Sequence, residues 1–116
     1  MNVLVCGDRN WTNRKAIKNA LMGLLKDTTI INGACQGADK LSTDVARELG
    51  FTVQEFPANW IKLGKVAGPV RNQDMIDIGS PDLVIAFHSD IANSKGTLDM
   101  CKRARKANIP VILIGE

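Results

Sequence analysis

The chain has 116 residues and a formal net charge of +3, and hydrophobic and charged residues make up 45% and 23% of it. This is enough apolar surface to fold without metals or cross-links, and we expect residues 1–116 to form one domain with one core. No apolar run approaches the roughly 20 residues that span a bilayer, and the first run is too short for a signal peptide, which excludes a membrane partner and predicts a cytoplasmic protein.

The first half of the chain alternates strand and helix patterns. The apolar run Asn2–Cys6 predicts a strand and is followed by a polar turn. Apolar residues then recur at helical spacing through Ala16–Leu25, which predicts a helix. A second strand is predicted at Thr29–Asn32. The next helix opens near Gly37–Asp39, and Gly50 is a natural stop for it.

The second half continues the same alternation. Its three predicted strands are Thr52–Phe56, Leu83–Phe87 and Ile109–Ile114. After the first of them, a long connection over residues 58–67 leads to a helix that starts at Gly68-Pro69, where proline suits the first helical position, and that stops at Gly79. The last helix opens at Gly96-Thr97 and ends at Asn108.

Strands that alternate with helices favour a parallel sheet with helices on both faces, which is a Rossmann-like three-layer α/β domain. The continuously apolar strand Leu83–Phe87 agrees, because a parallel sheet is covered on both sides. Right-handed crossovers leave few strand orders, and we favour 3-2-1-4-5 over the flavodoxin-like order 2-1-3-4-5. In either order, ligands bind beyond the carboxyl ends of the strands, near the point where the order reverses.

Residues suited to binding an anion follow the predicted strands. The candidate ligand-binding residues are Gly7, Asp8, Arg9, Trp11, Gly33, Gly37, Asp39, Arg71, Asn72, Ser94, Gly96 and Thr97. Glycines at strand-to-helix turns leave N–H groups and a helix dipole free for an anion, and we expect Gly33 and Gly37 to allow close ligand approach. Asp39 either caps its helix or faces the ligand. Trp11 either covers a base or ribose or caps the core.

Arg71 is the favoured anion ligand among these residues. It lies in the first turn of its predicted helix, where the dipole disfavours a cation by up to about 1 kcal/mol and a bound anion would reverse that cost. The alternative is an ion pair with Asp74 at i+3. Asn72 is expected to hydrogen-bond a ribose or a base. Ser94, Gly96 and Thr97 are expected to cradle a phosphate, unless Thr97 only caps the last helix.

Metal or disulfide chemistry is not expected. The three cysteines, Cys6, Cys35 and Cys101, are odd in number and include no Cys-x-x-Cys pair, which is typical of reduced thiols inside a cell. His88 is the only histidine, so a metal site lacks its ligands, and we expect no metal and no cofactor. A single histidine at a strand end is more often structural than catalytic, and we give His88 no role.

In chain order, the segments Val5–Arg9, Gly33–Asp39, Ala67–Met75 and Ser94–Thr97 together resemble the SLOG superfamily, which includes the Smf/DprA and Lonely-Guy lineages. The similarity is greatest to its small stand-alone YspA-like branch. The resemblance implies a Rossmann-like sheet that binds nucleotides or nucleotide-derived signals. It places the phosphate-binding role on Gly96 and Thr97 and the ligand-facing arginine at Arg71.

The chain departs from the hydrolase members of that superfamily. The Lonely-Guy signature is Pro-Gly-Gly-x-Gly-Thr-x-x-Glu, and residues 92–100 here are Ala-Asn-Ser-Lys-Gly-Thr-Leu-Asp-Met. Met100 occupies the glutamate position and cannot transfer protons. Asp99 is one residue early and, at about 100° per residue, is expected to point elsewhere. The other carboxylates that could substitute are Asp8, Asp39 and Asp90. Whether the protein is an enzyme is therefore left open.

Three functions remain, in this order. The first is a sensor or sequestering protein for a nucleotide-derived ligand, either ADP-ribose-like or cyclic. The second is a nucleotide N-glycoside hydrolase that resembles a phosphoribohydrolase. Single-stranded nucleic-acid binding is third, and nucleic acid is not the expected partner, because the net charge is mild and aromatic residues are few.

Two surface clusters are interpreted separately. Trp60, Ile61 and Leu63 in the long connection form an apolar patch. We expect the patch to make the protein a homo-oligomer, the alternative being that it covers the core. The basic cluster Lys102, Arg103, Arg105 and Lys106 falls near a helix end, where cations stabilise the dipole, and we interpret it in that way first.

Overall fold

The structure is a computed structural model that describes residues 1–116. Its five strands form one parallel sheet in the order β3-β2-β1-β4-β5. The strands are β1 (Asn2–Gly7), β2 (Thr29–Asn32), β3 (Thr52–Glu55), β4 (Leu83–Phe87) and β5 (Val111–Ile114). The predicted fold class and the favoured strand order are confirmed, and the flavodoxin-like order is excluded.

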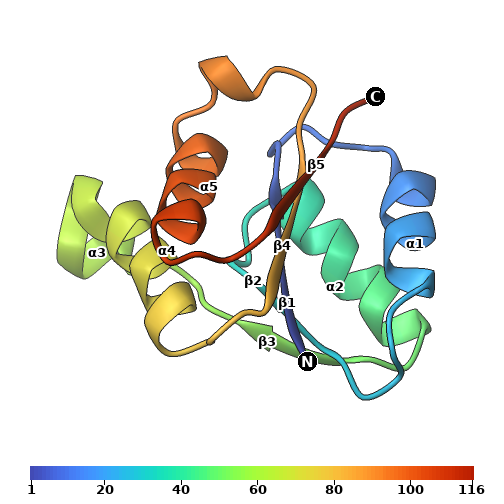
Figure 1. The fold of residues 1–116 in the computed structure, drawn as a ribbon. Helices are drawn as coiled ribbons and strands as arrows, with labels where there is room; N and C mark the ends of the chain where they lie inside the picture. Colours follow the sequence, from blue (N-terminus) through green and yellow to red (C-terminus); the bar gives the residue numbers. More distant parts are fainter.

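Helices cover both faces of the sheet. They are α1 (Arg14–Met22), α2 (Ala38–Glu48), α3 (Trp60–Leu63), α4 (Ala67–Asp77) and α5 (Gly96–Lys106), with single 3₁₀ turns η1 (Gly64–Val66) and η2 (Ile91–Asn93). Figure 1 shows α1 and α2 on one side of the sheet and α3, α4 and α5 on the other. None of these helices is both long enough and apolar enough to cross a membrane.

Two apolar clusters, one on each face of the sheet, form the core. On β1, Val3 and Val5 pack toward α1 and α2, whereas Leu4 and Cys6 pack toward α4 and α5. Val3, Leu4 and Val5 are all fully buried. Because successive side chains of a strand point to opposite faces, a strand covered on both sides must be apolar throughout. The three cysteines form no disulfide.

The register of the central strands brings two loops together. Gly7, the last residue of β1, pairs with Phe87, the last residue of β4. From this point the chain leaves β1 toward one side of the sheet and leaves β4 toward the other, so that the strand order reverses here. A Cβ atom at Gly7 would collide with the backbone oxygen of Phe87 and lie 2.8 Å from Cβ of Ala38. Only glycine therefore lets the β1–α1 loop pass this close to β4.

Helix ends follow the predicted stop residues, but the long connection does not follow its prediction. Gly50 (φ +87°) and Asn108 (φ +61°) adopt left-handed conformations after α2 and α5. Residues 58–67 are not a plain loop, since they contain α3 and η1. The Asn59 side chain caps α3 by accepting a hydrogen bond from the backbone N–H of Lys62 at 3.0 Å. Because η1 leads directly into α4, that helix starts at Ala67, before the predicted start at Gly68-Pro69.

Candidate functional site

A cavity of about 680 Å³ opens at the carboxyl ends of β1 and β4. Its lining comes from the β1–α1 and β2–α2 loops, α3, η1, α4 and the start of α5. Nine of the twelve predicted ligand-binding residues line it, namely Gly7, Asp8, Arg9, Asp39, Arg71, Asn72, Ser94, Gly96 and Thr97. Trp11, Gly33 and Gly37 do not. The topological switch point thus gathers segments that are far apart in the sequence, as the strand order requires.

Arg71 is held firmly by hydrogen bonds and makes no ion pair. Its Nε donates to Oδ1 of Asn72 at 2.9 Å, and its Nη1 donates to the backbone oxygens of Gly33 at 2.6 Å and of Phe56 at 3.5 Å. Nη2 donates to no protein atom. Arg71 belongs to none of the three ion pairs of the protein, which excludes the alternative pairing with Asp74. A fixed guanidinium with one free nitrogen therefore borders the cavity.

The expected position of Arg71 in the first helical turn is wrong. Because η1 continues into α4 without a break, the helix starts at Ala67, and Arg71 lies in its second turn. The helix dipole acts mainly on the terminal turn. Three hydrogen bonds position Arg71, two to the backbone oxygens of Gly33 and Phe56 and one to the side chain of Asn72.

Asn72 helps to position Arg71, and the expected contact of its amide with a ribose or base stays a prediction. The side chain is 5% exposed. Its Nδ2 donates to Oδ2 of Asp99 at 2.9 Å and to the backbone oxygen of Gly96 at 3.4 Å, while its Oδ1 accepts from Arg71. Both amide donors and one acceptor position are therefore used inside the protein, and Asn72 connects Arg71 to α5.

Asp99 lines the cavity, although we expected it to point elsewhere. Its Oδ2 accepts hydrogen bonds from Asn72 at 2.9 Å and from Nε of Arg103 at 2.8 Å. Burial works against ionisation, but these bonds outweigh it and hold the pKa of Asp99 below its ordinary value. The carboxylate therefore stays ionised and is already bound by the protein. Met100, at the glutamate position of the hydrolase signature, is buried beside it.

Asp39 is the carboxylate that the structure distinguishes. Asp39 lies in the first turn of α2, lines the cavity and is 6% exposed. Its Oδ2 accepts from the backbone N–H groups of Gly33 at 3.0 Å and Cys35 at 3.2 Å. Burial raises the pKa of Asp39 to about 6, against the lowering effects of these N–H groups and of Arg71. It both caps its own loop and faces the cavity.

The other candidate carboxylates are placed differently. Oδ1 of Asp8 accepts from the backbone N–H of Asn10 at 2.9 Å, as in an Asx turn. Asp90 does not line the cavity, and its Oδ2 accepts from Nδ2 of Asn93 at 2.8 Å. His88 lines the cavity, and its Nδ1 accepts from the backbone N–H of Asp90 at 2.9 Å. No group of three or more His, Cys, Asp or Glu side chains is placed to share a metal ion.

The two glycines of the β2–α2 loop make room for other parts of the protein, and the expected close approach of a ligand to them stays a prediction. A Cβ atom at Gly33 would lie 2.8 Å from Cζ of Arg71, so the missing side chain makes room for the guanidinium. At Gly37 (φ +76°) a Cβ atom would collide with the backbone of Asp8 and Arg9. The start of α2 is also occupied by the protein itself, since Ala38 donates its backbone N–H to the oxygen of Asp8 at 3.1 Å.

Trp11 does not cover the cavity. It is 4% exposed, its ring lies 5.6 Å from that of Phe87 at an angle of 55°, and its Nε1 donates to the backbone oxygen of Asn13 at 2.9 Å. The prediction that it covers a base or ribose is therefore wrong, and the alternative that it caps the core is what the structure shows. The apolar part of its ring packs on Phe87, and its polar N–H group has a hydrogen-bond acceptor in Asn13.

At the start of α5, Ser94 provides the cap that was considered for Thr97. Its Oγ accepts from the backbone N–H of Thr97 at 3.1 Å. Gly96 borders the cavity, and a Cβ atom there would meet no heavy atom within 4 Å. The packing of the chain therefore does not require glycine at this position, and the space above it belongs to the cavity.

Trp60 and Lys65 are lining residues that sequence reasoning missed, because residues 58–67 carried no recognised motif. Trp60 is 56% exposed, and its ring covers Gly68, where a Cβ atom would lie 3.2 Å from Cη2 of the indole. Lys65 and Lys95 add positive charge to the lining. Trp60 and Ile61 do not cover the core, since both are exposed, and the homo-oligomer expected from their patch stays a prediction.

Cys6 contributes an uncharged group to the cavity lining. Cys6, at the end of β1, is buried and lines the cavity. Its hydrogen bond to the sulfur of Cys101, followed by burial, raises the pKa of the Cys6 thiol well above its ordinary value. The thiol therefore stays protonated, and the charges at this site come from the loops and helix starts around it.

Comparisons with known proteins agree with this fold. The model of the YspA, cpYpsA-related SLOG family matches residues 1–62. The gene 61 protein of Mycobacterium phage D29 is 34% identical, over 98% of this chain and 96% of that protein. The X-ray structure of DNA processing protein A (DprA) from Streptococcus pneumoniae superposes with a TM-score of 0.77 at 20% identity, over 97% of this chain. This chain spans about half of DprA (49%), and the likeness shows a shared fold. It lends no support to the expectation that nucleic acid is not a partner.

Proposed function

The chain belongs to the YspA, cpYpsA-related SLOG family, and on that basis we propose that it binds a nucleotide-derived ligand as a sensor or sequestering protein. The proposed site is the cavity at the carboxyl ends of β1 and β4. Its volume of about 680 Å³ lies within the range of small-molecule sites, roughly 300–1,000 Å³.

The unpaired guanidinium of Arg71 is the observation that carries this proposal. Three of its contacts are with neutral oxygens, Nη2 has no partner, and no carboxylate lies within ion-pair distance. The charge of Asp39 acts on Arg71 without direct contact, and a phosphate would make the charge-assisted hydrogen bonds to Nη2 that no protein group makes. Arg9, Lys65 and Lys95 line the same cavity and add to its attraction for anions.

Trp60 supports a base or another flat group as the second part of the ligand. Its half-exposed ring is held in place against Gly68 at the edge of the cavity. An aromatic face in this position is suited to stacking, which tolerates any base. A ligand with phosphate at Arg71 and a ring on Trp60 would span the cavity.

The direct test uses the fluorescence of Trp60 and the small molecules that the protein carries. The protein has two tryptophans, Trp11 in the core and Trp60 at the cavity. A Trp11→Phe variant therefore leaves Trp60 as the only source of indole fluorescence. Nucleotides such as AMP, ADP-ribose and cyclic AMP are expected to quench it at saturable concentrations, and mass spectrometry is expected to recover an intact nucleotide from heat-denatured protein. No quenching by any nucleotide, together with no bound nucleotide, would contradict the proposal.

Replacing Gly96 by alanine should weaken ligand binding without weakening the fold. The added methyl group meets no protein atom but enters the cavity, so affinity for the quenching nucleotide is expected to fall about tenfold while the melting temperature holds or rises slightly. Gly23→Ala is the matched control, because a Cβ atom at Gly23 also meets nothing and Gly23 does not line the cavity. Equal affinity in both variants would exclude the start of α5 from the site.

A nucleotide N-glycoside hydrolase is the second candidate, favoured by one observation. The pKa of Asp39 is raised by burial to about 6, which is suited to a group that donates a proton to a departing base. Chromatography of the protein with AMP would then show free adenine, and Asp39→Asn would abolish it. Recovery of intact AMP after long incubation would leave the sensor or sequestering function.

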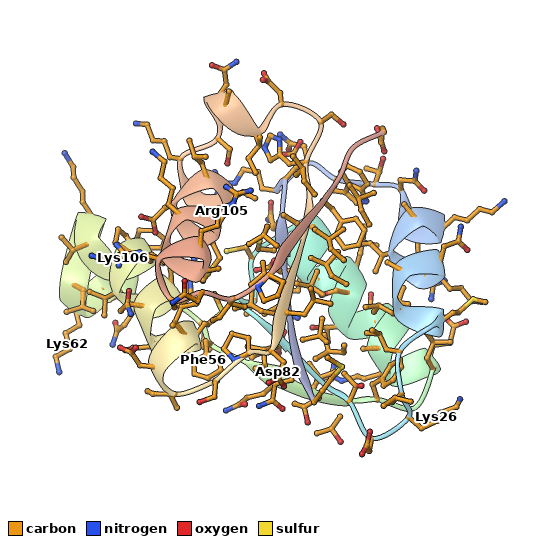
Figure 2. The ribbon with its side chains drawn as sticks, viewed as in Figure 1. Lys26, Phe56, Lys62, Asp82, Arg105 and Lys106 are labelled. Atoms are coloured by element: carbon orange, nitrogen blue, oxygen red, sulfur yellow. The ribbon has the colours of Figure 1, made fainter.

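Nucleic acid is the third candidate, considered because the structural neighbour DprA is a DNA processing protein. The exposed basic residues Arg105 and Lys106 lie at the C-terminal end of α5 (Figure 2). At 1.5 Å per residue, this end is roughly 15 Å along the helix from Gly96, which lines the cavity. These basic residues are therefore not part of the cavity. We expect single-stranded DNA of about 20 nucleotides to bind no more tightly than a mononucleotide in fluorescence anisotropy. Tight binding that falls steeply with salt would instead favour this function.

A further inference from the structure

We propose that Asp39 determines specificity by accepting a hydrogen bond from a ribose hydroxyl, so that the cavity takes 5′-phosphoribosyl ligands and rejects their dideoxy counterparts. This inference rests on the proposed function, since it concerns the same cavity. It assigns a ligand class, a phosphate joined to an intact ribose, where the proposed function names only a nucleotide-derived ligand.

The carboxylate of Asp39 has one occupied and one unoccupied oxygen. Both backbone hydrogen bonds, from Gly33 at 3.0 Å and Cys35 at 3.2 Å, go to Oδ2. No protein N–H or O–H group donates to Oδ1, although the residue is only 6% exposed and lines the cavity. Thr28 Oγ1 is the only fully buried side-chain oxygen or nitrogen without a partner, so Oδ1 of Asp39 is open to the cavity. A ligand hydroxyl can therefore replace water as the donor to this oxygen.

Asp39 and Arg71 are bound to the same residue. Gly33 donates its N–H to Oδ2 of Asp39 and accepts at its oxygen from Nη1 of Arg71 at 2.6 Å. The free acceptor, Oδ1, and the free donor, Nη2, are thereby fixed at one short stretch of the cavity wall. A ligand that meets both carries an anion for Nη2 and a hydroxyl group for Oδ1, and a 5′-phosphoribosyl group carries the two on one sugar.

Among the lining carboxylates, only Asp39 is both buried and joined to a fixed guanidinium, since Asp8 is partly exposed and its neighbour Arg9 is exposed. Asp99 is bound by Asn72 and Arg103, and the amide donors of Asn72 are used within the protein. At neutral pH Asp39 is mostly ionised, because burial raises its pKa only to about 6, so it acts as an acceptor.

Calorimetry with the four nucleoside 5′-monophosphates and their 2′,3′-dideoxy counterparts at about pH 7.5 tests the inference. The base is the same within each pair, so its contribution cancels. The protein is expected to bind at least one ribonucleotide about tenfold or more tightly than its dideoxy counterpart. In Asp39→Asn, the amide oxygen can keep the two backbone hydrogen bonds while its NH₂ group replaces the acceptor. The preference is then expected to fall below about twofold while inorganic phosphate still binds.

Asp44→Asn is the matched control, since Asp44 is an exposed residue of α2 outside the cavity and the charge change is the same. This variant is expected to keep the full preference. Equal affinity of wild-type protein for both sugars, with binding that still requires Arg71, would overturn this inference and leave the proposed function intact. An undiminished preference in Asp39→Asn would also overturn it. Failure of every monophosphate to bind, together with no nucleotide recovered by mass spectrometry, would overturn both.

Discussion

Arg71→Ala is expected to weaken binding of the quenching nucleotide about 100-fold or more, as measured by Trp60 fluorescence or calorimetry. The substitution removes the only guanidinium that is both fixed by the protein and free of a carboxylate. Truncating one side of a desolvated, charge-assisted contact typically costs about 2–5 kcal/mol, and 100-fold corresponds to about 2.8 kcal/mol. The affinity of Arg71→Lys should lie between those of the wild-type protein and Arg71→Ala, since lysine keeps the charge but loses the planar pair of donors.

Arg105→Ala is the control for the Arg71 variants, because it also removes an arginine but lies exposed on α5 outside the cavity (Figure 2). Its affinity should equal that of the wild-type protein. The fold should tolerate Arg71→Ala, since the released oxygens of Gly33 and Phe56 can bond water from the cavity. If Arg71→Ala bound nucleotides as tightly as Arg105→Ala, the anion site would lie elsewhere.

Asp39 is expected to make the stability of the protein fall as pH rises from about 4 to about 6. Its pKa in the folded protein is raised by burial to about 6, above the ordinary value of 3.8. The folded state therefore binds more protons than the unfolded state in this interval, so the contribution is fully present below pH 4 and is lost above pH 6. About two pKa units correspond to about 3 kcal/mol. Urea unfolding at several pH values measures this loss of unfolding free energy.

The comparison must be made with Asp39→Asn, which cannot titrate. The difference in unfolding free energy between the two proteins isolates Asp39 from groups that titrate in both. Facing Asp39 are Arg71 from α4, Cys35 in its own loop and Cys6 from β1, with Asp8, Arg9 and His88 also in the cavity lining. Relative to the variant, wild-type protein should lose stability between pH 4 and 6. A difference that is flat across this interval would show that Asp39 is not buried as described.

Much of the fold follows from local sequence signals. Runs such as Leu83–Phe87 are apolar at every position because both faces of a parallel strand are covered, and this property can be read without coordinates. Gly50 and Asn108 mark helix ends because few residues accept a left-handed backbone. The order 3-2-1-4-5 then follows from right-handed crossovers, and with it the edge of the sheet where the cavity lies.

The partner of each side chain, by contrast, is decided by packing between segments distant in the sequence. Trp11 and Trp60 each follow an asparagine in a polar connection, so the neighbouring residues do not distinguish them. In the structure Trp11 packs on Phe87 in the core, whereas Trp60 lies at the edge of the cavity. Asn72 is an ordinary polar residue of α4 until α5 brings Asp99 within 2.9 Å of its amide.

Asp39 shows the same limit at the proposed site. Three aspartates were equal candidates by residue type, because a pattern of residue types gives neither burial nor hydrogen-bond partners. Tertiary structure buries Asp39, joins it to Arg71 through Gly33 and leaves one of its oxygens free. The sequence therefore specified which edge of the sheet would bind, and long-range packing specified which groups there are unsatisfied and available to a ligand.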